Sequence, residues 1–148
     1  MLRALSLYQP WATLVTHGLK EYETRSWEAS HRGMLAIEAA RKWTTDEQGA
    51  AKRLADGLPD EVRADLVDAR LRGCVLCVVE LVTCEPSEVV VQRITEEERQ
   101  RGDYSSGRYA YRIARVQRLV RPVPVRGRMR IWQLTEQEEA AVRAALAG

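Results

Sequence analysis

One stretch near the N-terminus, residues 5–33, constrains the fold more than any other part of the 148-residue chain. It opens on an apolar run, Ala4–Leu7, that alternates as a short strand does. Pro10 ends this strand and begins a helix, because the fixed φ of proline suits the first helical position. Trp11 starts an apolar stripe at helical spacing, and Gly18 stands where a left-handed residue ends a helix. A strand followed by a short helix is therefore predicted.

Charged residues crowd the segment that follows this helix. Lys20, Glu23 and Arg25 lie within six residues of one another, and Trp27 comes just after them. On an extended strand Lys20 and Thr24 share one face, whereas Glu23 and Arg25 share the other. Such a set is either a solvated strand or the wall of a cleft, in which paired charges orient each other and bind a phosphate or a base edge. We favour the cleft wall.

The rest of the chain predicts strands separated by irregular helices, with most of the strands late. Two helices near 44–70, the first begun by a capping box of Thr44 and Glu47, are expected to form a lid or side insertion. The apolar run Gly73–Thr83 is expected to be a central strand. The other predicted elements are strands over 34–40, 108–120 and 129–134, a helical segment over 87–101 and a C-terminal helix over 135–147. This pattern indicates an α+β fold, a small mixed barrel surrounded by helices.

Size and composition predict one domain over residues 1–148, because 148 residues with 45% hydrophobic side chains can bury one core. We find no signal-peptide pattern and no run near the ~20 apolar residues that span a membrane. A cytoplasmic location without membrane association is therefore expected. An odd count of three cysteines also suits a reducing compartment better than a disulfide framework.

The cysteines and histidines do not predict a cofactor. Cys74 and Cys77 lie three residues apart inside a predicted strand, so we expect their side chains to point to opposite faces as small buried hydrophobes. The two histidines follow no metal-ligand spacing, and no glycine-rich phosphate loop is present. We expect neither a metal nor a bound nucleotide cofactor.

The net charge of +2 conceals a strong asymmetry along the chain. The segment Arg99–Leu134 holds ten arginines and one acid, Asp103, a net charge of +9, so the remainder carries about −7. An asymmetry of this kind indicates a polyanionic partner. Two carboxylates inside apolar strands, Glu80 and Glu38, are expected either to form ion pairs, Glu80 with Lys20 or Arg25, or to lie at an edge in water.

The motifs of residues 5–33 resemble the signature of the ASCH (activating-signal-cointegrator-1 homology) family. The shared pattern is SL-x-Q-P-W-A, then G-x-K-x-x-E-x-R-S-W, then H-R-G, in the version carried by the eukaryotic coactivator. The resemblance extends over residues 2–134, with an insertion around 44–70. It implies a PUA-like barrel (pseudouridine synthase and archaeosine transglycosylase) and a cleft between barrel and helix lined by Lys20 and Arg25, with Glu23 between them.

The leading functional hypothesis is a nucleic-acid-binding domain, with RNA favoured over DNA, that uses this cleft and an arginine-rich face. Arginine supplies bidentate donors to phosphate, and aromatic rings stack on unpaired bases. The residues expected to bind nucleic acid are Lys20, Arg25, Ser26, Trp27, Arg32, Arg41, Lys42, Tyr104, Arg108, Arg112, Arg128 and Arg130. Three other aromatic residues of the chain, Tyr109, Tyr111 and Trp132, are alternatively part of the core.

An enzyme is the second hypothesis. One ASCH branch hydrolyses an acylated cytidine with a lysine, a threonine and a glutamate, and ribonuclease activity is attributed to another member. Lys20 matches the lysine, but Glu23 occupies the position of the threonine, and Glu80 or one of Glu96–Glu98 is a candidate for the third residue. A catalytic set would comprise Lys20 as base with Glu23 or Glu80 as acid. A third hypothesis is a protein-interaction module whose acidic helices near 44–70 bind a partner.

Overall fold

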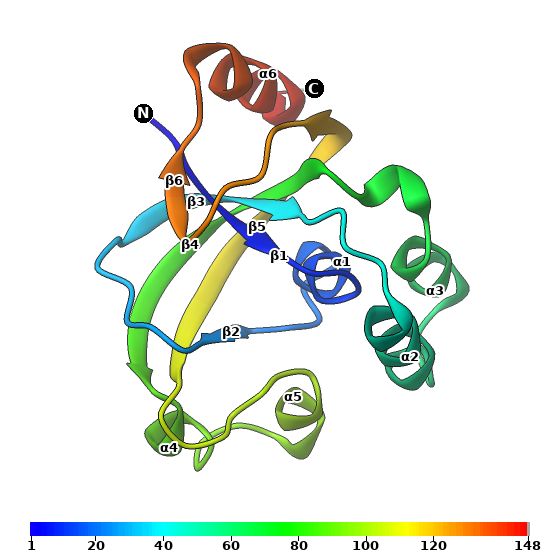
Figure 1. The fold of residues 1–148 in the computed structure, drawn as a ribbon, viewed down its shortest axis with the longest axis vertical. Coiled ribbons are helices and arrows are strands. Elements are labelled where there is room, and N and C mark those ends of the chain that lie inside the picture. The colour runs from blue at the N-terminus through cyan, green and yellow to red at the C-terminus, as the bar shows by residue number, and fades with distance from the viewer. Residues whose placement is uncertain (148) are drawn as a thin grey trace.

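A single mixed sheet of six strands forms the frame of the computed structural model, which describes residues 1–147 (Figure 1). The strands follow the spatial order β2-β5-β4-β3-β1-β6. β1 and β3 run parallel, and every other neighbouring pair is antiparallel. The strands are β1 (Arg3–Leu7), β2 (Tyr22–Arg25), β3 (Gly33–Ala39), β4 (Cys74–Pro86), β5 (Tyr109–Pro124) and β6 (Ile131–Gln133).

The two longest strands, β4 and β5, bend the sheet into a half-barrel (Figure 1). Their ladder shifts register at three places, and each such bulge bends the strand and increases its twist. One edge of β5 pairs with β4 along its length, whereas the other edge pairs with β2 only through Tyr109–Arg112. The remainder of that outer edge has no strand partner among the described residues. The predicted α+β barrel-like fold with a central apolar strand is thus confirmed.

Helices lie on both faces of the sheet and at its ends (Figure 1). α1 packs on one face through Ala12 and Val15, while α6 packs on the opposite face through Val142 and Ala145. α2 and α3 pack beside α1. The helices are α1 (Trp11–Thr16), α2 (Thr45–Leu54), α3 (Asp60–Leu66), α4 (Ser87–Val90), α5 (Glu96–Gln100) and α6 (Glu136–Ala147), with a 3₁₀ turn, η1 (Ala69–Leu71).

Alternation along the strands divides the core in two. Leu5 and Leu35 point to the α1 side of the sheet, whereas Ala4 and Ala36, their neighbours in the chain, point to the α6 side. Between β1 and α1, the side chain of Gln9 is fully buried: it accepts a hydrogen bond from the amide of Thr13 and donates one to the carbonyl of Leu71. This glutamine thereby ties the first helix to η1.

The helix boundaries follow the predicted local signals. Thr44 and Glu47 form the capping box that begins α2, and Thr135 with Glu138 forms an equivalent pair before α6. Gly18 has φ +71°, the left-handed conformation expected after α1. The second helix of the 44–70 insertion ends at Leu66 rather than at the predicted end of the insertion, because Asp68 accepts a hydrogen bond from the amide of Arg70 and thereby favours the 3₁₀ turn.

The predicted helical segment over 87–101 consists of two short helices, α4 and α5, joined by a turn. Two other expectations about local structure are wrong. Lys20 precedes β2, which begins at Tyr22, so strict strand alternation does not govern the side chain of Lys20. Cys74 and Cys77 belong to the same core cluster rather than to opposite faces, because the ladder between β3 and β4 shifts by one residue between Val75 and Cys77.

Candidate functional site

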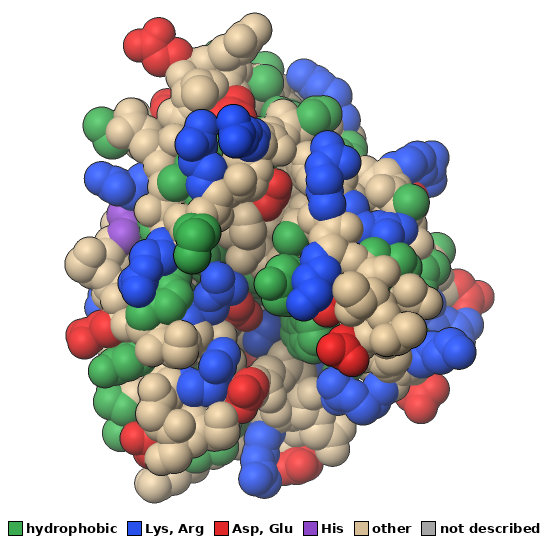
Figure 2. Space-filling model, viewed as in Figure 1, with side chains coloured by type: hydrophobic (Ala, Val, Ile, Leu, Met, Phe, Trp, Pro, Cys, Tyr) green, Lys and Arg blue, Asp and Glu red, His purple; other side chains and the backbone are tan. Residues whose placement is uncertain are grey.

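A cleft of about 880 Å³ opens where the loop 125–130 faces α5 and the segment that carries β2. Lys and Arg side chains surround a hollow in the middle of this face (Figure 2). Six cationic and two acidic side chains are among the lining residues. The lining comprises Ser6, Tyr8, Trp11, Lys20, Glu23, Thr24, Arg25, Ser26, Trp27, Arg53, Gln100, Gly102, Asp103, Arg108, Arg128, Met129 and Arg130.

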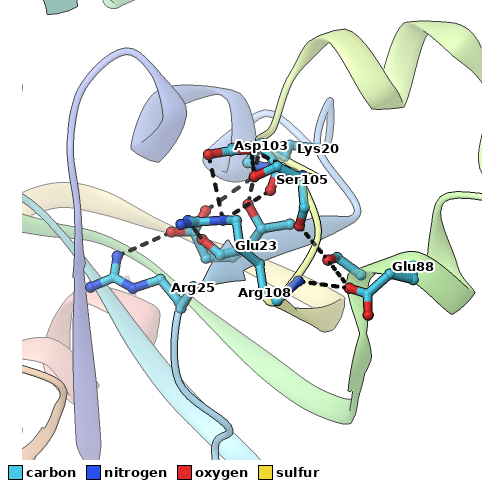
Figure 3. Close-up of polar contacts among 10 residues, drawn as sticks. Lys20, Glu23, Arg25, Glu88, Asp103, Ser105 and Arg108 are labelled. Carbon is cyan, nitrogen blue, oxygen red and sulfur yellow. Dashed lines mark hydrogen bonds and ion pairs between the residues drawn. The ribbon is translucent and has the colours of Figure 1, made fainter.

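Lys20 lies at the bottom of the cleft and is only 2% exposed. Its ammonium group donates a hydrogen bond to the carbonyl of Tyr22 and lies 3.8 Å from Glu23 Oε1. Figure 3 shows Glu23 between Lys20 and Arg25. Because Lys20 precedes the strand, its side chain turns toward Glu23. Lys20 and Glu23, which were expected on opposite faces of a strand, therefore lie close together.

A third buried group, Glu98 of α5, lies beneath the cleft beside Lys20. Its carboxylate accepts hydrogen bonds from the amide of Glu21, at 2.9 Å, and from the hydroxyl of Tyr104, at 3.4 Å. Burial raises the pKa of Glu98, and the Glu21 amide and Lys20 oppose that rise. Burial likewise lowers the pKa of Lys20, against the attraction of Glu23 and Glu98. Each buried charge therefore depends on the others for compensation.

Arg25 and Trp27 form the wall next to this floor. The guanidinium group of Arg25 lies 3.1 Å from Glu23 Oε2 and also donates to the carbonyl of Ser6, so its position is fixed from two sides. Both Arg25 and Arg130 lie over the Trp27 ring, at 5.9 and 4.8 Å from its centroid. The Trp27 carbonyl accepts a hydrogen bond from Tyr111 of the core. A partly exposed indole is thus held rigidly at the mouth of the cleft.

The opposite wall comes from the loop before β5. Arg108 donates hydrogen bonds to the carbonyls of Asp103 and Thr24, at 3.0 and 2.9 Å, and its guanidinium lies 3.6 Å from the Asp103 carboxylate (Figure 3). The hydroxyl of Thr24 accepts from the amide of Asp103. Glu23 and Thr24 are adjacent on β2, yet both line the cleft, because the loop folds over this end of the strand.

The structure gathers about half of the predicted nucleic-acid-binding residues in the cleft. Those that line it are Lys20, Arg25, Ser26, Trp27, Arg108, Arg128 and Arg130. Four others lie outside: Arg32 donates to nearby backbone carbonyls, Lys42 lies over the Tyr8 ring, Arg41 faces a neighbouring basin, and Arg112 is exposed elsewhere. Alternation alone does not reveal which arginines of a basic segment share a surface.

Two predicted site residues have other roles. Tyr104 is 9% exposed, packs against Val90 and Ala110, and directs its hydroxyl to Glu98, so it is a core residue rather than a stacking platform. Glu80 does not line the cleft: its carboxylate pairs with Arg115, at 3.1 Å. The predicted pairing of Glu80 with Lys20 or Arg25 is therefore wrong.

Some of the cleft residues were not expected from the sequence. Tyr8 and Trp11 come from the junction of β1 and α1, Arg53 from α2 and Met129 from the loop before β6. Arg53 reaches the cleft by donating to the carbonyl of Gln100, across 47 residues of the chain. Arg53 belongs to the predicted side insertion. The local periodicity does not indicate that this insertion contacts Gln100, because periodicity reports only on residues close together in the chain.

The two buried cysteines of β4, Cys74 and Cys77, are not activated thiols. Burial raises the pKa of the Cys74 thiol to about 11 and that of Cys77 to about 12, which keeps both protonated. Within residues 1–147 no group of three or more His, Cys, Asp or Glu side chains is arranged to hold a metal ion. None of the described helices combines the length and apolar character that crossing a membrane requires.

A mixed six-stranded half-barrel with flanking helices is the PUA-like architecture, and comparison with solved structures agrees. The crystal structure of ASCH from Zymomonas mobilis matches with a TM-score of 0.60 over 97% of this chain and 94% of that one, at 14% sequence identity. Structures of two variants of the same bacterial protein match at a TM-score of 0.59. The family model of the ASCH domain matches residues 5–122, so the chain belongs to the ASCH domain family.

Activating signal cointegrator 1 is a relative by sequence. The mouse (Mus musculus) and human (Homo sapiens) proteins are each 30% identical to this chain over 134 residues, which is 88% of the chain. The chain spans only 22% of the length of these relatives. The likeness to the coactivator version of the family signature is confirmed.

Proposed function

We propose that this domain binds nucleic acid, RNA in particular, in the cleft between β2, α5 and the loop 125–130. One observation carries the proposal: six cationic side chains surround a cleft that contains only two acids, and a rigid indole stands at its mouth. Guanidinium groups bind phosphate through paired donors, and an aromatic face stacks on unpaired bases.

The pairing of the charges supports the same proposal. Glu23 and Asp103, the acids of the cleft, already interact with Lys20, Arg25 and Arg108. Arg128 and Arg130 form no ion pair among the described residues, and both are exposed. Cations without a partner in the protein are available to a polyanion. PUA-like folds serve many purposes, so the family supports this proposal by analogy alone.

Fluorescence anisotropy with short single-stranded RNA, duplex RNA and DNA tests the proposal. Arg25→Ala/Arg130→Ala removes two cations from the cleft and should weaken RNA binding by about 10-fold or more, given ~1 kcal/mol or more for each phosphate or stacking contact. Arg112→Ala/Arg121→Ala is the matched control, because it removes the same charge from exposed positions outside the cleft. Failure to bind any nucleic acid, or equal weakening by both variants, would contradict the proposal.

Hydrolysis is a second candidate function, favoured by the burial of Lys20. An amine whose pKa is lowered by burial is a better base near neutral pH than an exposed lysine. Glu23 and Thr24 line the same cleft. We infer a substrate class of acylated cytidines or RNA, with Lys20 as base and Glu23 as acid, and without the Glu80 considered from the sequence.

Product analysis with acylated cytidine and with RNA distinguishes the two functions. If the domain is a hydrolase, Lys20→Ala should abolish turnover while a folded variant still binds RNA. An unchanged rate in that variant would rule out a catalytic Lys20. RNA binding by the wild type without turnover of either substrate leaves the binding function alone.

A further inference from the structure

We propose that a basin beside the cleft is a second nucleotide subsite that takes a guanine base, so that the ligand is a single-stranded RNA of at least two nucleotides. This inference rests on the proposed function, because it extends the ligand of the same cleft. It follows from the position of one buried carboxylate, Glu38, among arginines that do not neutralise it.

The basin has a volume of about 780 Å³, within the range of pockets that enclose small organic ligands. It shares Ser6, Arg128 and Met129 with the cleft, so the two hollows adjoin across a short ridge that these residues form. We call it the Glu38 basin. Its other lining residues are Glu38, Ala40, Arg41, Pro124, Val125, Arg126, Gly127 and Glu138.

Glu38 is 3% exposed, an unusual position for a carboxylate without a cation. Its Oε1 accepts a hydrogen bond from the hydroxyl of Ser6, and no ion pair to Glu38 is present among the described residues. Arg41 lowers and Glu138 raises the pKa of Glu38, but burial is the largest influence and raises it. A buried acceptor with spare capacity thus lines the basin.

The other acid of the basin is already occupied. Glu138 accepts hydrogen bonds from the amides of Thr135 and Arg126, as the capping residue of α6. Gly127 lies against Glu38: a Cβ at this glycine would meet the two carboxylate oxygens at 2.8 and 2.9 Å. The absence of a side chain at residue 127 therefore keeps the space beside both oxygens of Glu38 free of a Cβ.

Guanine matches this arrangement of donors and acceptors better than the other bases. Its N1–H and N2–H₂ are adjacent donors that fit the two oxygens of one carboxylate, whereas each other common base offers one donor group. Its O6 and N7 are acceptors that arginine recognises in a bidentate manner. The guanidinium groups of Arg41, Arg126 and Arg128 line the same basin, and Arg41 is held against the backbone of Gly73.

The ridge between the two hollows suits a strand that passes from one to the other. Met129 lines both hollows and is 88% exposed, although it is a large apolar side chain. Apolar side chains of this kind insert between neighbouring bases in nucleic-acid complexes. Arg128 lines both hollows as well, so it is placed to bind the phosphate that joins the two nucleotides.

Fluorescence anisotropy with two single-stranded RNA oligomers tests the inference: an oligouridine and the same oligomer with one central guanosine. The wild type should bind the guanosine oligomer about 10-fold more tightly, as a good bidentate pair discriminates. Glu38→Gln should abolish this preference, because an amide presents one acceptor and one donor where the carboxylate presents two acceptors. Its affinity for oligouridine should change less than two-fold.

Gly127→Ala is the second variant, and it keeps every charge of the basin. The added Cβ would displace the Glu38 carboxylate, so this variant should also reduce the preference for guanosine. Gly49→Ala is the control, because Gly49 is exposed and has open space around it. Failure of both oligomers to bind the wild type would overturn the proposed function itself. Equal binding of both by the wild type, or a preference retained in folded Glu38→Gln and Gly127→Ala, would overturn only the guanine subsite.

Discussion

At the scale of single residues, the buried charges beneath the cleft depend on one another. Lys20 is the buried cation beside Glu23 and Glu98, whereas Arg25, the second cation that contacts Glu23, is partly exposed. Removal of Lys20 takes away the cation that opposes the cost of burying Glu98, and loss of one member of a buried charged set usually costs more than loss of the whole set.

We therefore predict that Lys20→Met lowers the free energy of unfolding by about 3 kcal/mol, as measured by urea denaturation. Lys52→Met, at an exposed position on α2, should have little effect. The double variant Lys20→Met/Glu23→Gln should be more stable than the sum of the single effects predicts, because it removes both members of the pair. Additive effects would show that Lys20 and Glu23 do not interact.

Glu38 gives stability a pH dependence whose sign follows from its pKa. Burial raises the pKa of Glu38 in the folded state, so the folded protein retains a proton that the unfolded chain has released. Stability from this group is therefore greatest at low pH and is lost as pH rises from the ordinary carboxyl pKa through the raised one. Glu38→Gln should gain in stability relative to the wild type over that interval. Urea unfolding of both proteins at several pH values measures this gain. A difference in unfolding free energy that does not change with pH would contradict the prediction.

At the scale of elements, the first side helix, α2, has few core contacts and a complete capping box at its start. α2 contributes only Ala51, Leu54 and partly buried neighbours to its cluster, while Thr44 and Glu47 satisfy the free amides at its start. We predict that Thr44→Ala destabilises the domain by about 1 kcal/mol, whereas Thr45→Ala, one residue inside the helix, has a much smaller effect. Chemical denaturation of both variants provides the comparison. Equal losses would mean that the hydroxyl of Thr44 adds nothing beyond helix propensity.

Local signals in the sequence predicted these elements well. Gly18, the Thr44 capping box and the apolar run from residue 73 each act through contacts within a few residues, so they are legible in the chain itself. The cleft was predictable only in part. Lys20, Arg25 and Trp27 belong to one continuous motif, but Arg53 and Glu98 approach it through long-range contacts. The bulge that brings Cys77 to the same face as Cys74 likewise has no local signature.

At the scale of the whole molecule, nucleic-acid binding through the cleft should depend steeply on salt. Five arginines line the cleft, and contact of about three to five of them with phosphates gives a slope of log K against log salt of about −2 to −3.5 for a single strand. Arg25→Ala/Arg130→Ala should reduce the magnitude of this slope by about 1.4, while Arg112→Ala/Arg121→Ala should leave it unchanged. Titrations at several salt concentrations measure the slope, and its absence would exclude a phosphate-binding surface.

The outer edge of β5 has a consequence for how copies of the domain behave at high concentration. Beyond Arg112 this edge has no strand partner in the described part of the chain, and such an edge can recruit a strand from another molecule. Several features oppose that addition: Pro122 and Pro124 lack an amide donor, Arg115 adopts a φ of 51° where the register of the ladder shifts, and Arg121 adds an exposed charge. The same basic segment that supplies arginines to the cleft thus also protects the longest strand from edge-to-edge aggregation.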